Sequence, residues 1–187
     1  MNKFAKAVIA LGILVLVSGS AHSDDKNKNK NDGTSLHAQL KGFQEVPSVS
    51  TVATGELTAR INPGDASIDY TITYSGLQGN VTQSHIHIGQ RSVNGGIVLW
   101  FCQTATNPGP AGTPTCTNGS GTFSGTFTSA NVVAIGGANV GQQVNAGDFA
   151  KVVAALRGGV AYANVHTVLS TGGEIRGQIK VVRGDKD

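Results

Sequence analysis

Residues 67–74 read SIDYTITY, and this stretch decides the fold class. Apolar and polar side chains alternate strictly along it, which is the period of a strand with one buried and one exposed face. The preceding residues 55–61 also carry apolar side chains on one face, and residues 62–65 (NPGD) are typical turn residues. The two segments therefore predict an antiparallel hairpin. The side chains expected on its buried face are those of Leu57, Ala59, Ile61, Ile68, Tyr70, Ile72 and Tyr74.

Similar short segments, separated by Gly, Pro and Asn, follow along the chain. They predict further strands at residues 35–41, 81–88, 97–101, 121–127, 160–167 and 174–182. Residues 147–157 are the one window with helical spacing, and Asp148 suits the first turn of such a helix. This pattern predicts an all-β protein, an antiparallel Greek-key β-sandwich or flattened barrel of about eight strands with one short helix.

Composition limits the domain organisation to one globular unit with tails. The chain has 187 residues, of which 26 are Gly without a G-X-Y period, and 39% are hydrophobic. A collagen-like or wholly disordered chain is therefore excluded. We divide the chain into a signal peptide at 1–23, a polar tether at 24–34, a domain at 35–182 and a short tail at 183–187.

The first 23 residues have the layout of a secretory signal. Lys3 and Lys6 precede an apolar run at 7–17, and small residues precede the expected cleavage after Ser23. The run falls short of the roughly 20 residues that span a bilayer, so an uncleaved anchor is the weaker alternative and no membrane span is expected after cleavage. We therefore predict a secreted or periplasmic location.

The charge of the expected mature chain argues against a nucleic-acid partner. Removing residues 1–23 takes away two Lys and no acidic residue, which leaves 12 Lys and Arg against 11 Asp and Glu. Such a balance provides no electrostatic footprint for nucleic acid or anionic lipid.

Cys102 and Cys116 are the only cysteines, and both lie in the exported part. An even count in an oxidising compartment favours one disulfide, which would close a loop rich in Pro, Gly and Thr. A redox pair is disfavoured because the spacing is not C-x-x-C.

Three histidines carry the strongest chemical signal. His85 and His87 are two residues apart on a predicted strand, so their imidazoles project from one face about 7 Å apart. Two such imidazoles suit zinc or copper, and His166 would supply a third ligand if its strand lay alongside. The alternative is that these residues are polar side chains on a half-exposed face, with hydrogen bonds to neighbours such as Gln83 or Thr167.

Other polar residues give weaker signals. Glu45, Glu174 and Arg176 are candidates for a polar site, and a carboxylate paired with Arg176 is more often a structural ion pair than a catalytic one. A hydrolase acting through Glu45 or Glu174 with a histidine is a third alternative. We assign no catalytic residue, because the sequence has no G-x-S-x-G, phosphate-loop or H-E-x-x-H motif.

Several motifs, in their order and spacing, resemble the chordin-type (CHRD) domain family over residues 36–182. These are GFQEVP at 42–47, ATG at 53–55, YSGL at 74–77, HIH at 85–87, YANVHT at 162–167 and GGEIRGQ at 172–178. The resemblance implies a secreted β-rich module, found as a single exported domain in bacteria and in several copies in animal chordins, and it implies no particular activity. The chain departs from the family pattern at residues 100–122, where a loop with both cysteines is inserted, and at Ser48, where a second Pro is common.

A weaker similarity is to the barrels of copper/zinc superoxide dismutases. Gly76 and Leu77, the HIH segment and the pair Val165 and His166 follow one another in a similar order. No histidine lies between His87 and His166, so the bridging and zinc ligands of those enzymes have no counterpart.

Two hypotheses about function follow. The first is a non-enzymatic exported module that binds another protein or a component of the extracellular matrix or cell envelope. The alternative is a protein that binds copper or zinc through His85, His87 and His166, with storage, transfer or redox chemistry as its role.

Overall fold

The structure is a computed structural model, and it describes residues 33–182. The predicted signal peptide, most of the tether and the tail lie outside the described residues. Antiparallel strands build the domain, as the alternating pattern predicts. The strands are β1 (Thr34–Lys41), β2 (Thr54–Ile61), β3 (Ile68–Ser75), β4 (Val81–Ile88), β5 (Gly96–Cys102), β6 (Gly121–Phe127), β7 (Ala161–Thr167), β8 (Ile175–Gln178) and β9 (Lys180–Val181).

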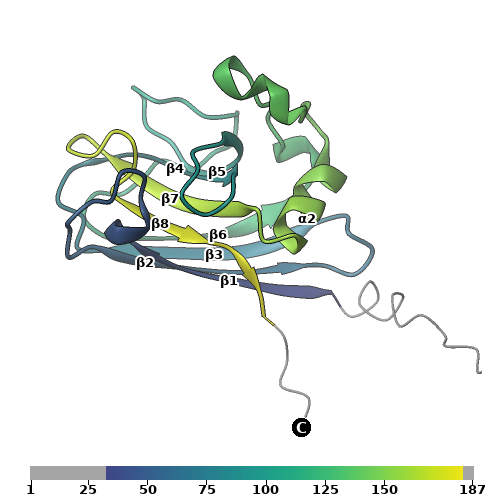
Figure 1. Ribbon diagram of the computed structural model, residues 1–187, viewed down its shortest axis with the longest axis horizontal. Coiled ribbons are helices and arrows are strands. Elements are labelled where there is room, and N and C mark those ends of the chain that lie inside the picture. Colours follow the sequence, from purple (N-terminus) through teal and green to yellow (C-terminus); the bar gives the residue numbers. More distant parts are fainter. Residues whose placement is uncertain (1–32, 183–187) are drawn as a thin grey trace, which may run out of the picture.

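The strands form one strongly curved sheet in the order β5-β4-β7-β8-β1-β2-β3-β6, with β9 paired to β1. Figure 1 shows the sheet folded over on itself, with β1, β2 and β3 below and β4, β5 and β7 above. The two ends of the sheet meet across the core, because Phe101 of β5 packs against Tyr70 of β3 and Phe127 of β6. The result is a nearly closed barrel, which agrees with the predicted sandwich or flattened barrel.

The hairpin formed by β2 and β3 confirms the prediction made from the alternating pattern. β2 and β3 pair in register from Thr54–Ser75 to Ile61–Ile68. The alternating apolar side chains of β3 are all buried, and Ile72 is completely inaccessible.

Residues 129–157 form the helical cover at one end of the barrel (Figure 1). They contain two 3-10 helices, η3 (Ser129–Asn131) and η4 (Gly137–Gln142), followed by α2 (Phe149–Arg157); a third 3-10 helix, η2 (Gly42–Gln44), follows β1. The apolar face of α2 enters the core, and Arg157 donates two hydrogen bonds of 2.6 Å to the Asp65 carboxylate in the β2–β3 turn. No helix within residues 33–182 has the length and hydropathy to cross a bilayer.

Several predicted boundaries differ from the structure, most of them by one residue. The helix begins at Phe149 and not at 147, because Gly147 has a φ of +83°, which is incompatible with a right-handed helix. The Asp148 carboxylate accepts the N–H of Asn145 and leaves the helix N–H groups uncapped. The expected strand at 174–182 is divided at Ile179, whose N–H donates to Ala161, and β1 begins at Thr34, the last residue that we assigned to the tether.

Candidate metal centre

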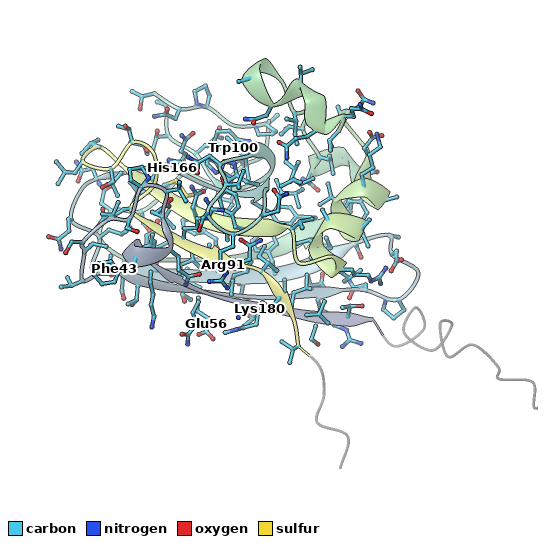
Figure 2. The ribbon with its side chains drawn as sticks, viewed as in Figure 1. Phe43, Glu56, Arg91, Trp100, His166 and Lys180 are labelled. Carbon is cyan, nitrogen blue, oxygen red and sulfur yellow. A yellow bond between two sulfur atoms is a disulfide. The ribbon has the colours of Figure 1, made fainter. Side chains whose placement is uncertain are left out.

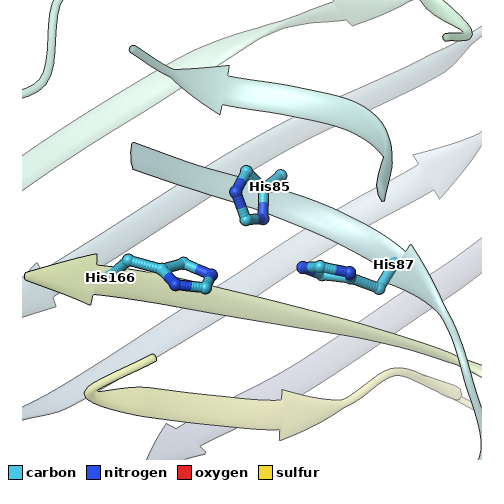
Figure 3. A group of neighbouring side chains, drawn as sticks. All are labelled: His85, His87 and His166. Carbon is cyan, nitrogen blue, oxygen red and sulfur yellow. The ribbon is translucent and has the colours of Figure 1, made fainter. Parts of the chain in front are cut away.

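β4 and β7 pair antiparallel and bring the three predicted histidines together. His85 lies opposite Asn164, and His87 lies opposite Tyr162. His166 is two residues beyond Asn164 on β7, so it shares the face of the sheet from which the other two histidines project. The three imidazoles meet between the two strands (Figure 3).

The histidines are buried. Their exposed fractions are 0% for His85, 7% for His87 and 6% for His166. The interpretation of a half-exposed face with hydrogen bonds to Gln83 or Thr167 is therefore wrong. It fails because Trp100, on the neighbouring strand β5, packs against His85, and Gly109 of the following loop packs against Trp100.

The rings form a compact group. The centroid of His85 lies 4.7 Å from that of His87 and 4.7 Å from that of His166, and the other two centroids are 6.3 Å apart. One ring nitrogen from each histidine lies within 4.8 Å of those of the others. Metal–nitrogen bonds of about 2.0 Å would place neighbouring ligand nitrogens about 3.3 to 3.5 Å apart, so binding an ion would draw these nitrogens together by up to about 1.4 Å.

One nitrogen of each ring is held by an oxygen acceptor. His85 Nδ1 is 3.0 Å from Asn164 Oδ1, His87 Nδ1 is 2.8 Å from the Gly95 carbonyl, and His166 Nδ1 is 2.8 Å from the Thr171 carbonyl. A carbonyl or amide oxygen can only accept, so each Nδ1 carries the proton and each Nε2 has a free lone pair. This is the arrangement by which proteins fix the tautomer and orientation of metal-binding histidines.

The three Nε2 atoms are buried and have no hydrogen-bond partner. A buried acceptor without a partner is costly, so one occupant shared by the three Nε2 atoms would remove this cost.

Burial also sets the protonation state. Burial is the main reason why the pKa of His87 is lowered to about 4. Electrostatic interactions with His166 and Arg176 contribute smaller parts of this lowering. Burial lowers the pKa of His85 well below its usual value and also that of His166. All three imidazoles are therefore neutral at pH 7, the form that binds metals.

Aromatic residues surround the group, and the sequence analysis missed them. The His85 ring meets Trp100 edge-on at 4.9 Å, and the His87 ring stacks on Tyr162 at 4.6 Å with an angle of 5° between their planes. Trp100 and His166 both lie in the upper half of the molecule, whereas Glu56 lies on the outer side of the lower strands (Figure 2). The sequence analysis also missed Asn164. The alternating pattern of β7 could have indicated both Tyr162 and Asn164, because they share one face of the strand with His166.

Arg176 and Glu45 lie behind this group. The Arg176 guanidinium sits 3.4 Å from the centre of the Tyr162 ring and donates to Asn94 and to the carbonyls of Gln90 and Val93. Burial raises the pKa of Glu45 to about 7, against the lowering effects of the Val46 N–H, the Arg176 charge and the Asn164 amide.

Glu174 has a structural role. Its Oε1 accepts hydrogen bonds from the Thr51 hydroxyl and the Gln78 N–H, and its Oε2 accepts one from the Thr167 hydroxyl, each 2.8 Å long. The carboxylate thereby joins three segments beside His166.

A model of the CHRD domain family matches residues 36–179. The chain belongs to this family. No curated protein and no solved structure matches it. The matched range corresponds closely to the domain that we placed at 35–182, and the three histidines and their Nδ1 partners all lie inside it.

The loop between Cys102 and Cys116 lies against Trp100, whose ring meets that of His85. The predicted disulfide between Cys102 and Cys116 is present and closes the inserted loop. Gly109 of the loop packs against Trp100 so closely that a Cβ there would lie 2.8 Å from the ring. A groove of about 740 Å³ runs between this loop and residues 133–139, with His87 and Trp100 in its lining.

Proposed function

We propose that this CHRD domain protein binds one copper or zinc ion through His85, His87 and His166. The observation that carries the proposal is the convergence of three buried Nε2 atoms without hydrogen-bond partners, each on a ring whose Nδ1 is held by an oxygen. Imidazole nitrogens suit zinc and copper better than they suit calcium or magnesium. Copper in such a site would supply one-electron chemistry, and zinc would supply a Lewis acid.

Family membership supports a broader role as a binding or structural module, and metal binding is one form of it. An extracytoplasmic location fits the signal-like leader and the disulfide. The groove beside Trp100 gives such a module a surface for a protein or cell-envelope partner.

Trp100 provides the test, because it is the only tryptophan of the chain and its ring meets that of His85. Titration of the purified mature protein with Cu²⁺ should quench its fluorescence with a stoichiometry of one, and elemental analysis after dialysis should find one ion per chain. His85→Ala, His87→Ala and His166→Ala should each abolish stoichiometric binding.

His37→Ala is the matched control, because His37 is a partly exposed histidine whose Nε2 bonds to Glu56 on the outer face of β1 and β2. This variant should bind the metal like the wild type. Equal loss in the control, or a wild type that binds none of Cu(I), Cu²⁺ and Zn²⁺, would show that the three histidines have only a structural role.

A further inference from the structure

We infer that the centre selects monovalent copper, Cu(I), over divalent ions, because its surroundings carry no anionic ligand and include a buried cation, Arg176. This inference rests on the proposed metal site and specifies the ion. It follows from the charge of the ligands, from their burial and from the residues stacked behind His87.

The ligands and their partners are all neutral. The group that can hold an ion consists of three histidines. Their Nδ1 atoms bond to one side-chain amide and two backbone carbonyls, whereas a carboxylate would increase the negative charge at the ligands. A divalent ion here keeps its full charge of two, and Cu(I) a charge of one.

Burial makes that difference large. The Born cost of transferring an ion from water into a protein interior grows with the square of its charge, so a divalent ion meets about four times the penalty of a monovalent one. The three Nε2 atoms have almost no contact with solvent, and Trp100 packs against His85. Water therefore does little to offset the penalty.

A stack of three residues places a positive charge behind the ligands. The Arg176 guanidinium lies over Tyr162 at 3.4 Å, and Tyr162 lies parallel to His87 at 4.6 Å. Arg176 is 1% exposed, so its charge is weakly screened. A positive charge at this position disfavours the second positive charge of a divalent ion more than it disfavours Cu(I).

Glu45 is the group that faces Arg176 and opposes this effect. Its burial raises its pKa to about 7, so at neutral pH it carries less negative charge than an ordinary glutamate. A second buried carboxylate, Glu174, lies beside His166 and also opposes the charge of Arg176, but three hydrogen-bond donors offset part of its own charge.

The number of ligands favours Cu(I) as well. Zinc in proteins is almost always four-coordinate, and with three histidines it needs a water molecule in the fourth position. The three Nε2 atoms have almost no contact with solvent, so that water would have to be held at an added cost of desolvation. Three-coordinate Cu(I) needs no fourth ligand.

The first experiment measures selectivity in the wild-type protein. Cu(I) affinity is determined without oxygen by competition with a colorimetric Cu(I) chelator, and Zn²⁺ affinity by competition with a fluorescent zinc chelator, at the same pH. We expect the dissociation constant for Cu(I) to be at least 100-fold lower than that for Zn²⁺. Equal affinities, or tighter Zn²⁺ binding, would overturn the inference while leaving the metal site in place; failure to bind either ion would overturn both.

The second experiment compares Arg176→Gln with Arg176→Lys. Both variants lose the guanidinium that donates to Asn94 and two carbonyls, so a loss of packing or folding affects both, but only the glutamine loses the charge. One unit charge within about 10 Å, at an effective dielectric constant near 20, changes the ratio of divalent to monovalent affinity about tenfold. Arg176→Gln should therefore narrow the Cu(I)/Zn²⁺ preference about tenfold and lower the Cu²⁺/Cu⁺ reduction potential by about 59 mV.

Arg176→Lys should keep both values close to those of the wild type. Equal changes in the two variants, or no change in either, would show that the charge of Arg176 does not set the selectivity. If neither variant folds, the wild-type selectivity and the variant Glu45→Gln still test the inference. Removing the opposing carboxylate should move the preference further toward Cu(I), and a shift toward Zn²⁺ would contradict it.

Discussion

Glu45→Gln should change how the stability of the metal-free protein depends on pH. The native pKa of Glu45 is about 7, against 4.5 for an ordinary glutamate, because the carboxyl group is buried. Between these values the native state holds a proton that the unfolded state has released, so the group stabilises the protein at low pH and loses this effect as the pH rises through 7. A shift of one pKa unit corresponds to about 1.4 kcal/mol. The contribution of Glu45 to the free energy of unfolding therefore falls by about 2.5 kcal/mol between pH 5 and pH 8.

Glutamine does not titrate, so the variant lacks this contribution. Its free energy of unfolding at pH 8, minus that at pH 5, should exceed the wild-type difference by about 2.5 kcal/mol. Urea denaturation followed by Trp100 fluorescence measures the free energy of unfolding at each pH. The histidines change this free energy with pH in the opposite direction, but their contribution is the same in the variant and the wild type and therefore cancels in the comparison. Glu56→Gln, at an exposed carboxylate, should follow the wild type. A difference below about 0.5 kcal/mol, or one of the opposite sign, would refute the burial argument.

Three further predictions concern the histidines, the disulfide and one glycine. Burial lowers the pKa of all three histidines, that of His87 to about 4, so metal affinity should fall less between pH 7.5 and pH 5.5 than the roughly thousandfold loss expected of three imidazoles with a pKa of 6.5; titrations at the two pH values decide between these outcomes. Replacing both Cys102 and Cys116 by alanine should lower the free energy of unfolding by about 3 kcal/mol on the chain-entropy model, and an unchanged urea midpoint would contradict that model. Gly173→Ala should destabilise by more than about 3 kcal/mol, since Gly173 has a φ of +127° and its new Cβ would overlap the Glu45 carboxyl group; a wild-type melting temperature would show that the loop moves freely.

Some elements of the site could be predicted from sequence and others could not. The pair at His85 and His87 was visible because two residues separated by one lie on the same face of a strand. The burial of Arg176 and the stack through Tyr162 were not visible. The alternating pattern says which side chains share a face, but it does not say what covers that face.

The sequence by itself determined the all-β class, the disulfide and most of the strand boundaries to within one residue. These depend on local periodicity, turn residues and cysteine count, which act over a few residues. Only the tertiary structure decided that β4 and β7 are neighbours, and hence that His166 meets two histidines about 80 positions earlier in the chain. It also decided that the three Nε2 atoms face one another without partners, because strand order and the covering of each face depend on non-local packing.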